Sequence, residues 1–74
     1  MNNTLNSPLN IIVNGQPSTQ PIGTCVAAIV EAMPLDGKRF AVERNGEIVP
    51  KSRLHETPIE DGDQYEIVIA VGGG

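Results

Sequence analysis

The sequence predicts a small α+β domain in which a mixed sheet of four or five strands wraps around one helix. Three observations support this prediction. Apolar residues alternate in several short segments, two Asn-Gly dipeptides stand where tight hairpin turns belong, and a single segment has helical periodicity with a broad apolar face. The chain has 74 residues, enough for one domain with one core but too few for a large enclosed active site.

The first hairpin is predicted near the N-terminal end. Apolar residues alternate in Leu9–Val13, as expected for a strand with one face on the core. The dipeptide Asn14-Gly15 follows at once and readily takes the positive φ angles of a tight turn. The return segment Gln16–Gln20 has little apolar content and contains Pro17, which lacks an N–H, so it is expected at an edge of the sheet.

One helix is predicted over residues 25–33, with Thr24 as its N-cap and Pro34 ending it. At about 100° per residue, its apolar side chains cover an arc of roughly 200°, and only Ala27 and Glu31 point away. The arc comprises Cys25, Val26, Ala28, Ile29, Val30, Ala32 and Met33. An arc of this width is typical of a helix that lies in a concave sheet.

A second hairpin is predicted in the middle of the chain. The segment Phe40–Arg44 alternates, Asn45-Gly46 is the second tight-turn dipeptide, and Glu47–Val49 is the short return strand. Residues 51–56 are expected to form a turn or a short helix. The two hairpins would thus flank the helix in the chain.

The last strand determines the predicted topology. Its core face is expected to hold Tyr65, Ile67, Ile69 and Val71, and its other face Glu66, Val68 and Ala70. If the helix is a crossover, the first and last strands can lie side by side as a central parallel pair. The chain would then consist of a disordered leader (residues 1–8), one domain (residues 9–71) and a flexible glycine tail (residues 72–74).

Composition and charge exclude several classes of function. Five basic and nine acidic residues give a formal net charge of −4, without a basic patch, so no nucleic acid is expected as a partner. Cys25 and His55 are the only residues of their types, so no zinc site of Cys and His and no internal disulfide can form. Cys25 is expected to fill the core and His55 to be solvated. No apolar segment is long enough to span a membrane, and a cytoplasmic protein without a membrane partner is expected.

Catalytic and metal-binding constellations are missing as well. The acidic segment 60–63 lacks the ligand spacing of a calcium loop and is expected to be a solvated turn. Its carboxylates have no predicted pocket that would raise their pKa values for acid or base catalysis. We therefore expect no catalytic residue, no metal site and no enzymatic activity of the chain itself.

The glycine run at residues 72–74 has two interpretations. It can be a frayed chain end, which is common in proteins. Alternatively it is a thin tail whose reactive group is the carboxylate of Gly74, ionised at neutral pH. A carboxylate resists nucleophiles, but a partner enzyme that transfers AMP onto it from ATP converts it into an acyl donor. Gly72 and Gly73 would then let the tail thread a narrow tunnel in that partner.

Such a tail requires a docking surface on the domain. Three extended residues reach about 10 Å, so the domain must bind close to the partner's active site. The candidate docking residues are Ala41, Val68 and Ala70, which are expected on the sheet face opposite the helix. The alternative is that these are scattered exposed apolar residues without a role.

The motifs along the chain resemble those of the sulfur carrier proteins of thiamine biosynthesis, a ubiquitin-like β-grasp family. The matching motifs are Val13-Asn14-Gly15, Thr24, Ala41-Val42, Asn45-Gly46-Glu47-Ile48-Val49-Pro50 with Lys51, Asp61-Gly62-Asp63 and Gly73-Gly74. Each motif alone is weak, whereas their order and spacing over residues 9–74 are specific.

The resemblance implies a role as a carrier protein. An E1-like adenylyltransferase would activate Gly74 with ATP and magnesium, while the chain itself binds no cofactor. A sulfur donor such as a cysteine desulfurase would convert the adenylate to a thiocarboxylate. Thiazole synthase would then take the sulfur to build the thiazole ring of thiamine.

The sequence departs from the family pattern at Cys25, where an apolar residue is usual, at Leu54, where tryptophan is frequent, and in the leader. Three alternatives stay open at this point. They are a sulfur carrier for molybdopterin or cysteine synthesis, a ubiquitin-like modifier of lysines, and an interaction module whose tail is idle. The asparagine-glycine-glutamate-isoleucine-valine-proline run favours thiamine biosynthesis.

Overall fold

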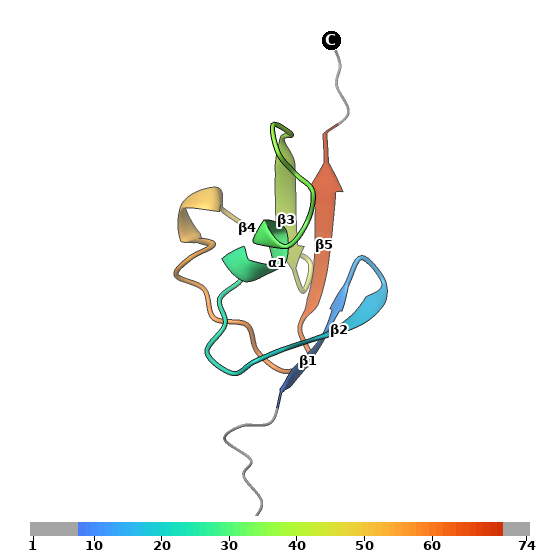
Figure 1. Cartoon of the computed structure of the whole chain (residues 1–74), viewed down its shortest axis with the longest axis vertical. Coiled ribbons are helices and arrows are strands. Elements are labelled where there is room, and N and C mark those ends of the chain that lie inside the picture. The colour runs from blue at the N-terminus through green and yellow to red at the C-terminus, as the bar shows by residue number, and fades with distance from the viewer. Residues whose placement is uncertain (1–7, 71–74) are drawn as a thin grey trace, which may run out of the picture.

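The centre of the molecule is a five-stranded mixed sheet with a short helix packed on one face, seen in a computed structural model that describes residues 8–70 (Figure 1). The elements are β1 (Leu9–Val13), β2 (Gln16–Gln20), α1 (Ala27–Glu31), β3 (Phe40–Arg44), β4 (Glu47–Val49), the 3₁₀ helix η2 (Lys51–Arg53) and β5 (Gln64–Ile69). The strand order is β2-β1-β5-β3-β4. The predicted α+β class is confirmed, and all five strand segments lie where they were expected.

The last strand, β5, occupies the middle of the sheet. It pairs in parallel with β1, where Val13 is opposite Tyr65, and antiparallel with β3, from the pair Phe40–Ile69 to the pair Arg44–Tyr65. The predicted central parallel pair is therefore confirmed. Since β5 has a neighbour on both sides, its backbone is fixed by two ladders of hydrogen bonds.

Both hairpin turns have the predicted conformation. Asn14 and Asn45 each have φ 51°, and the glycines that follow them also have positive φ, which is the geometry of a two-residue turn that matches the twist of a hairpin. The asparagine side chains do more than turn the chain. The amide oxygen of Asn14 accepts the Ile67 N–H at 2.7 Å, and that of Asn45 accepts the Gln64 N–H at 2.9 Å. Each turn is thereby joined to β5.

The helix is shorter than predicted. It begins at Ala27 rather than Cys25, its N-cap is Val26, and this cap makes no side-chain hydrogen bond, so the prediction of Thr24 as N-cap is wrong. The reason is a tertiary contact. The N–H of Val26 donates to the Thr57 carbonyl at 2.9 Å, and the N–H of Ala27 donates to the Leu54 carbonyl at 3.0 Å. The connection before β5 thus satisfies the free N–H groups of the first turn, and no hydroxyl is required.

The face that the helix turns toward the core also differs from the prediction. Ala27 was expected to point away from the core, but it is 1% exposed, whereas Ala32 was expected on the core face and is exposed. The turn before Ala27 is of the 3₁₀ type, with an Ala28 N–H to Cys25 carbonyl bond of 3.0 Å, so the helical period does not extend back to Cys25. Glu31 is exposed, as predicted.

The core lies between α1 and the inner face of the sheet. Its buried residues are Ile11, Val26, Ala27, Ile29, Val30, Leu35, Val42, Leu54, Ile59, Tyr65 and Ile67. Ile69 was expected among them but is partly exposed, because the end of β5 extends past the helix (Figure 1). Within residues 8–70, no helix has the length and hydropathy needed to cross a membrane.

Three predictions fall largely on residues that the structure does not describe. The leader (residues 1–8) lies outside the described residues except for Pro8, and the glycine tail (residues 72–74) lies outside them entirely. The same holds for Val71, the last residue expected on the core face of the final strand. These predictions, and the division of the chain at residues 9 and 71, stay predictions.

Replacing Ile29 by alanine tests the assignment of the core. Ile29 is buried at the centre of α1, so Ile29→Ala is expected to lower the free energy of unfolding by about 2–5 kcal/mol through lost burial and the cavity that remains. Urea denaturation followed by circular dichroism measures the change. Ile48→Ala is the matched control, because the same atoms are removed from a side chain that is 60% exposed. Equal losses in both variants would contradict the assigned core.

Candidate functional site

The described part of the chain ends directly after the central strand. Beyond β5, the Ala70 N–H donates to the Arg39 carbonyl at 2.9 Å, which continues the ladder between β5 and the segment before β3. The predicted reactive residue, Gly74, and the predicted threading residues, Gly72 and Gly73, lie outside the described residues. What the structure provides is the position at which the chain leaves the sheet, at the end of β5 beside the start of β3 (Figure 1).

The structure brings the predicted docking residues together on one sheet face. Ala41 and Val68 are directly opposite each other in the β3–β5 ladder, and Ala70 follows on the same side of the chain as Val68. Val68 is 51% exposed and Ala70 is exposed, while Ala41 is half-buried. This face, opposite α1, is called the outer face below. Their role in docking stays a prediction.

Two further large apolar side chains belong to the outer face and were missed. Ile48 of β4 is opposite Glu43, and Ile12 of β1 is opposite Gln64, which places both on the same side of the sheet as Val68. Both are exposed. The alternation of residues within β1 and β4 is a signal that could have found them, but the strand order was required to place them beside β3 and β5.

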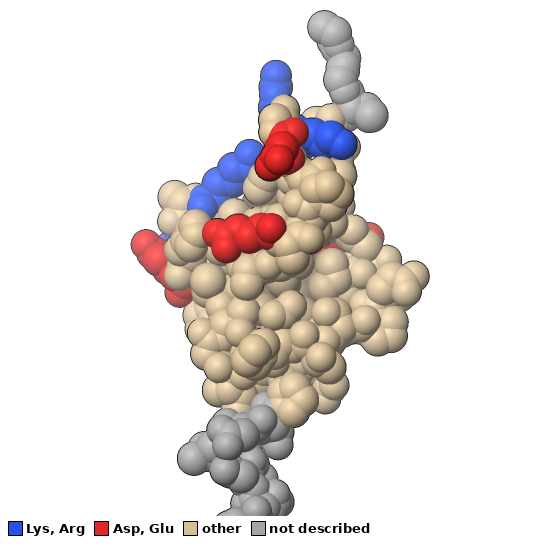
Figure 2. Space-filling view, viewed as in Figure 1, with Lys and Arg blue, Asp and Glu red and all other residues tan. Residues whose placement is uncertain are grey.

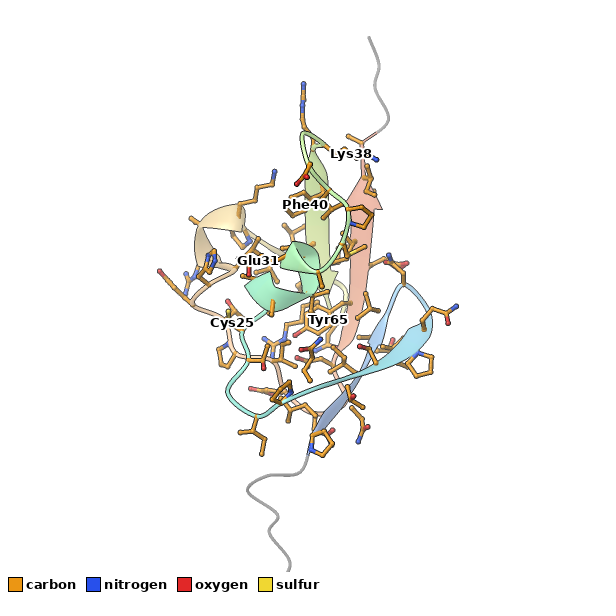
Figure 3. The ribbon with its side chains drawn as sticks, in the orientation of Figure 1. Cys25, Glu31, Lys38, Phe40 and Tyr65 are labelled. Carbon is orange, nitrogen blue, oxygen red and sulfur yellow. The ribbon has the colours of Figure 1, made fainter. Side chains whose placement is uncertain are left out.

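Basic side chains gather at the end of the molecule toward which β5 runs. Lys38, labelled in Figure 3, and Arg39 precede β3 at this end, and the Lys51 ammonium lies 4.4 Å from the centre of the Phe40 ring, a cation–π contact. Figure 2 shows the Lys and Arg side chains in the upper part of the molecule in this view. Acidic side chains lie among them in the same view.

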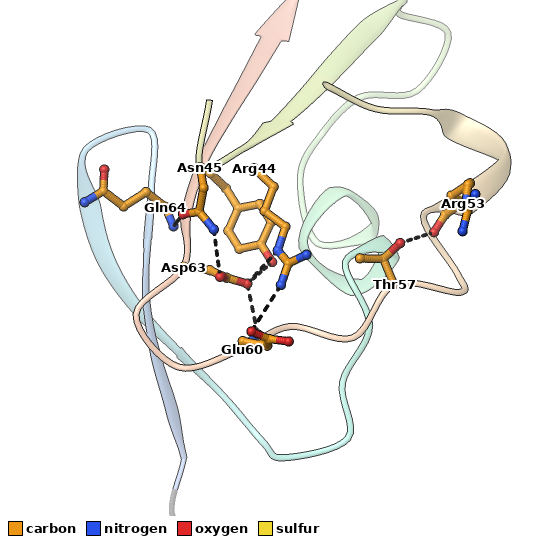
Figure 4. Close-up of polar contacts among 8 residues, drawn as sticks. Arg44, Asn45, Arg53, Thr57, Glu60, Asp63 and Gln64 are labelled. Carbon is orange, nitrogen blue, oxygen red and sulfur yellow. Dashed lines mark hydrogen bonds and ion pairs between the residues drawn. The ribbon is translucent and has the colours of Figure 1, made fainter. Parts of the chain in front are cut away.

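A buried carboxylate fixes the opposite end of β5. Asp63 is 4% exposed, whereas a solvated turn was expected here, so that prediction is wrong for this residue. Its oxygens accept four hydrogen bonds, from Tyr65 Oη at 2.7 Å, the Glu60 N–H at 2.9 Å, Arg44 Nε at 2.9 Å and Asn45 Nδ2 at 3.1 Å (Figure 4). The partners come from β3, the turn after it, the corner before β5 and β5 itself, so the carboxylate joins all four.

The ionisation of this cluster follows from its geometry. Burial by itself raises the pKa of Asp63, but the hydrogen bonds from Tyr65, the Glu60 N–H, Asn45 and Arg44 favour the carboxylate and together lower the pKa below its usual value. The pKa of Tyr65 is raised by burial and by its bond to Asp63. The bond to Asp63 also raises the pKa of Arg44. Asp63 is therefore a structural anion and not an acid–base catalyst.

The remaining titratable candidates make simple contacts. Cys25 is half-buried and packs against the core, in line with the prediction of a filler side chain. His55 is exposed, as predicted, with its Nε2 3.1 Å from an oxygen of Glu31. Among the residues that the structure describes, no three His, Cys, Asp or Glu side chains are arranged to hold a metal ion.

The fold defines the class of protein. A five-stranded mixed sheet that covers one short helix, with the last strand between the first and the third, is the β-grasp arrangement of ubiquitin-like proteins. A crystal structure of the thiamine biosynthesis protein ThiS from Geobacter metallireducens has the same fold, with a TM-score of 0.66 and 30% sequence identity, over 89% of this chain and 100% of that one.

Sequence comparisons identify the family. The model of the ThiS family matches residues 9–74. The sulfur carrier protein ThiS of Bacillus subtilis is 46% identical over 46 residues, which cover 62% of this chain and 70% of that protein. The chain therefore belongs to the ThiS family, the sulfur carrier proteins of thiamine biosynthesis. The resemblance stated from the motifs is confirmed, and with it a carrier rather than an enzyme.

A further relative is much longer than this chain. A thiazole synthase of Paramagnetospirillum magneticum is 38% identical over 66 residues, which are 89% of this chain but 20% of that protein. This chain thus spans about a fifth of that relative. A segment similar to this chain is thus part of a longer protein named thiazole synthase.

Substituting Asp63 tests the buried anion. Because the pKa of Asp63 is lower in the folded chain than in the unfolded one, its contribution to stability is present above about pH 4 and is lost as the pH falls further. Asp63→Asn is expected to lower the free energy of unfolding at pH 7 by about 2–4 kcal/mol and to flatten its decline below pH 5. Urea denaturation is measured from about pH 3 to pH 7, the range in which carboxylates titrate. It gives both the stability at neutral pH and its decline at low pH.

The control for this experiment is Asp61→Asn. Asp61 is exposed and accepts the Asn10 N–H through one oxygen, which an asparagine amide oxygen can replace. An Asp63→Asn protein with the stability and the acid dependence of the wild type would show that this carboxylate does not anchor β5.

Proposed function

We propose that the chain carries sulfur on the carboxylate of Gly74 for the synthesis of the thiazole ring of thiamine. The observation that supports this most directly is the extent of the family match, which runs from residue 9 through Gly74 and so includes the whole glycine segment. The proposal requires Gly74 to have a free carboxylate in the active protein. The proposed sulfur transfer takes place in the cytoplasm, where ATP is available.

Activation is the first step of the proposed reaction. An E1-like adenylyltransferase binds ATP and magnesium, and a carboxylate oxygen of Gly74 attacks the α-phosphorus. A new oxygen–phosphorus bond forms, and pyrophosphate leaves. The product is a mixed anhydride whose acyl carbon accepts nucleophiles, because AMP is a far better leaving group than oxide.

Sulfur transfer is the second step. A hydrosulfide that attacks the acyl carbon displaces AMP and leaves a thiocarboxylate. If the donor is the persulfide of a cysteine desulfurase, the first product is an acyl disulfide, and a thiol reductant must cleave its sulfur–sulfur bond to release the thiocarboxylate. Thiazole synthase then takes the sulfur from the carrier.

The chain contributes position rather than catalysis. Ordering the three glycines in a partner costs on the order of 3–6 kcal/mol of backbone entropy, and contacts of the folded domain must offset this cost. Ala41, Val68 and Ala70 are proposed for these contacts, because they lie together on the outer face next to the end of β5. The backbone of Gly72 and Gly73, without Cβ atoms, suits a narrow tunnel.

The proposed partners agree with the relatives. The thiazole synthase of Paramagnetospirillum magneticum includes a segment that resembles this chain, which supports an encounter between the two activities. A second thiazole synthase, from Magnetococcus marinus, has 29% identity over 66 residues in the same proportion of its length. Fusion of interacting domains raises their effective concentration without new contacts.

Deleting Gly74 tests the proposed reactive group. The shortened chain is expected to fold like the wild type, because the sheet and the core are formed by residues before Gly74, but to form no thiocarboxylate. Intact-mass spectrometry after incubation with ATP, magnesium, the adenylyltransferase and sulfide should show an exchange of one oxygen for sulfur in the wild type alone. The same exchange in the shortened chain would contradict the proposal, and a wild type without it would contradict sulfur carriage.

Replacing Val68 by glutamate tests the proposed docking face. The charge has no partner in an apolar contact, so Val68→Glu is expected to raise the KM of the adenylyltransferase for the carrier about tenfold or more. Ile22→Glu is the matched control, because Ile22 is 50% exposed and Val68 51%, and Ile22 lies in the connection between β2 and α1. Circular dichroism confirms that both variants fold. Equal KM values for the two variants would count against this face.

A further inference from the structure

Two carboxylates face each other on the outer face without a basic partner. Glu43 of β3 and Glu66 of β5 are directly opposite in the ladder, two pairs away from Ala41 and Val68 and therefore on the same face of the sheet. Both line a shallow depression of about 440 Å³, together with Ile12 of β1. In residues 8–70, neither carboxylate takes part in an ion pair.

This arrangement is unfavourable for the isolated domain. Like charges directly opposite on neighbouring strands repel each other and destabilise the sheet. The adjacent cation does not relieve the repulsion, because Arg44 points to the other side of the sheet and binds Asp63 there. The pair is thus an anionic site in a depression that Ile12 and the polar residues Asn14, Asn45 and Gln64 also line. A cation that the described residues do not supply would relieve its repulsion.

We propose that this depression binds an arginine of thiazole synthase when the carrier delivers its sulfur. A guanidinium group has five donors in a planar fork and can bridge two carboxylates, which a compact ammonium does less well. Its neighbours on the partner would be apolar and would cover Ile12 and Val68, both exposed on the same face. The inference rests on the proposed function, since it names the partner that takes the sulfur.

The position of the depression suits this partner. Glu66 precedes Ala70 by four residues, so the anionic site is about 13 Å along β5 from the end of the described chain. A contact at this distance would hold the carrier at two points, the anionic site and the tail, and would leave the tail free to enter the active site of the partner. The net charge of the chain, −4, also favours a partner with a basic surface, because opposite charges attract each other during association. Among possible partners with a basic surface, we choose thiazole synthase because two proteins of that name include a segment similar to this chain.

The double variant Glu43→Gln/Glu66→Gln tests the site. Its Kd for purified thiazole synthase of the same organism, measured by titration calorimetry, is expected to be about tenfold weaker than that of the wild type. Its affinity should also depend less on salt concentration, because two charges no longer take part. The melting temperature of the variant should equal or exceed that of the wild type, because the repulsion is gone. Weaker binding by a more stable fold cannot result from unfolding.

The control is Glu31→Gln/Glu47→Gln, which removes the same charge elsewhere. Glu31 is on α1, and Glu47 is opposite Arg44 on the helix side of the sheet. This variant is expected to bind like the wild type. A third variant, Glu66→Lys, places opposite charges across the ladder, so it should stabilise the fold and bind still more weakly.

Four results would overturn the inference. They are an unchanged Kd in the Glu43/Glu66 variant, equal losses in both double variants, a loss of binding with a lower melting temperature, and a wild type that does not bind thiazole synthase. A variant that binds thiazole synthase normally but is a poor substrate of the adenylyltransferase would also overturn the choice of partner. Thiocarboxylate formation on the wild type, read by mass, separates this outcome from failure of the proposed function itself.

Discussion

The carboxylate of Asp63 is the contact on which the rest of the structure depends. Its side chain accepts hydrogen bonds from both ends of the corner that precedes β5 and from the β3–β4 hairpin, while its backbone carbonyl accepts the Ile12 N–H at 3.0 Å. One residue thereby sets the start of the central strand against both neighbours. A buried anion is costly unless it is fully hydrogen-bonded, and here four donors satisfy it. The corner is consequently rigid where a solvated turn was expected.

Contacts between distant segments also form the helix. A five-residue α-helix has little stability of its own, and the first N–H groups of α1 donate to carbonyls of the connection at Leu54 and Thr57. The connection in turn is held by the isolated bridge between Cys25 and Pro58. Helix and connection therefore stabilise each other, and a leucine rather than a tryptophan at residue 54 still gives a buried anchor.

The layout separates scaffold from surface. The buried hydrophobic side chains of residues 8–70 form one core between α1 and the inner face of the sheet, and the large apolar residues of the outer face do not belong to it. Exposed apolar residues and paired carboxylates are unfavourable for an isolated domain, and a partner bound to the outer face would relieve both. Because β5 is central, the same strand that presents this face also leads to the glycine segment. In the proposed function, docking and sulfur delivery would therefore both depend on β5.

The sequence by itself determined the strands, the two asparagine-glycine turns, the central parallel pair and the family, because these follow from local periodicity, turn chemistry and the order of motifs. It also placed Ala41 and Val68 on one face, since alternation along a strand is local. Tertiary structure alone decided the start of the helix, the burial of Asp63 and the pairing of Glu43 with Glu66. Those features depend on which backbone groups and charges from distant parts of the chain meet, as the contact of Asn45 with Asp63 and that of Val26 with Thr57 show. Local sequence patterns do not show which distant segments come into contact.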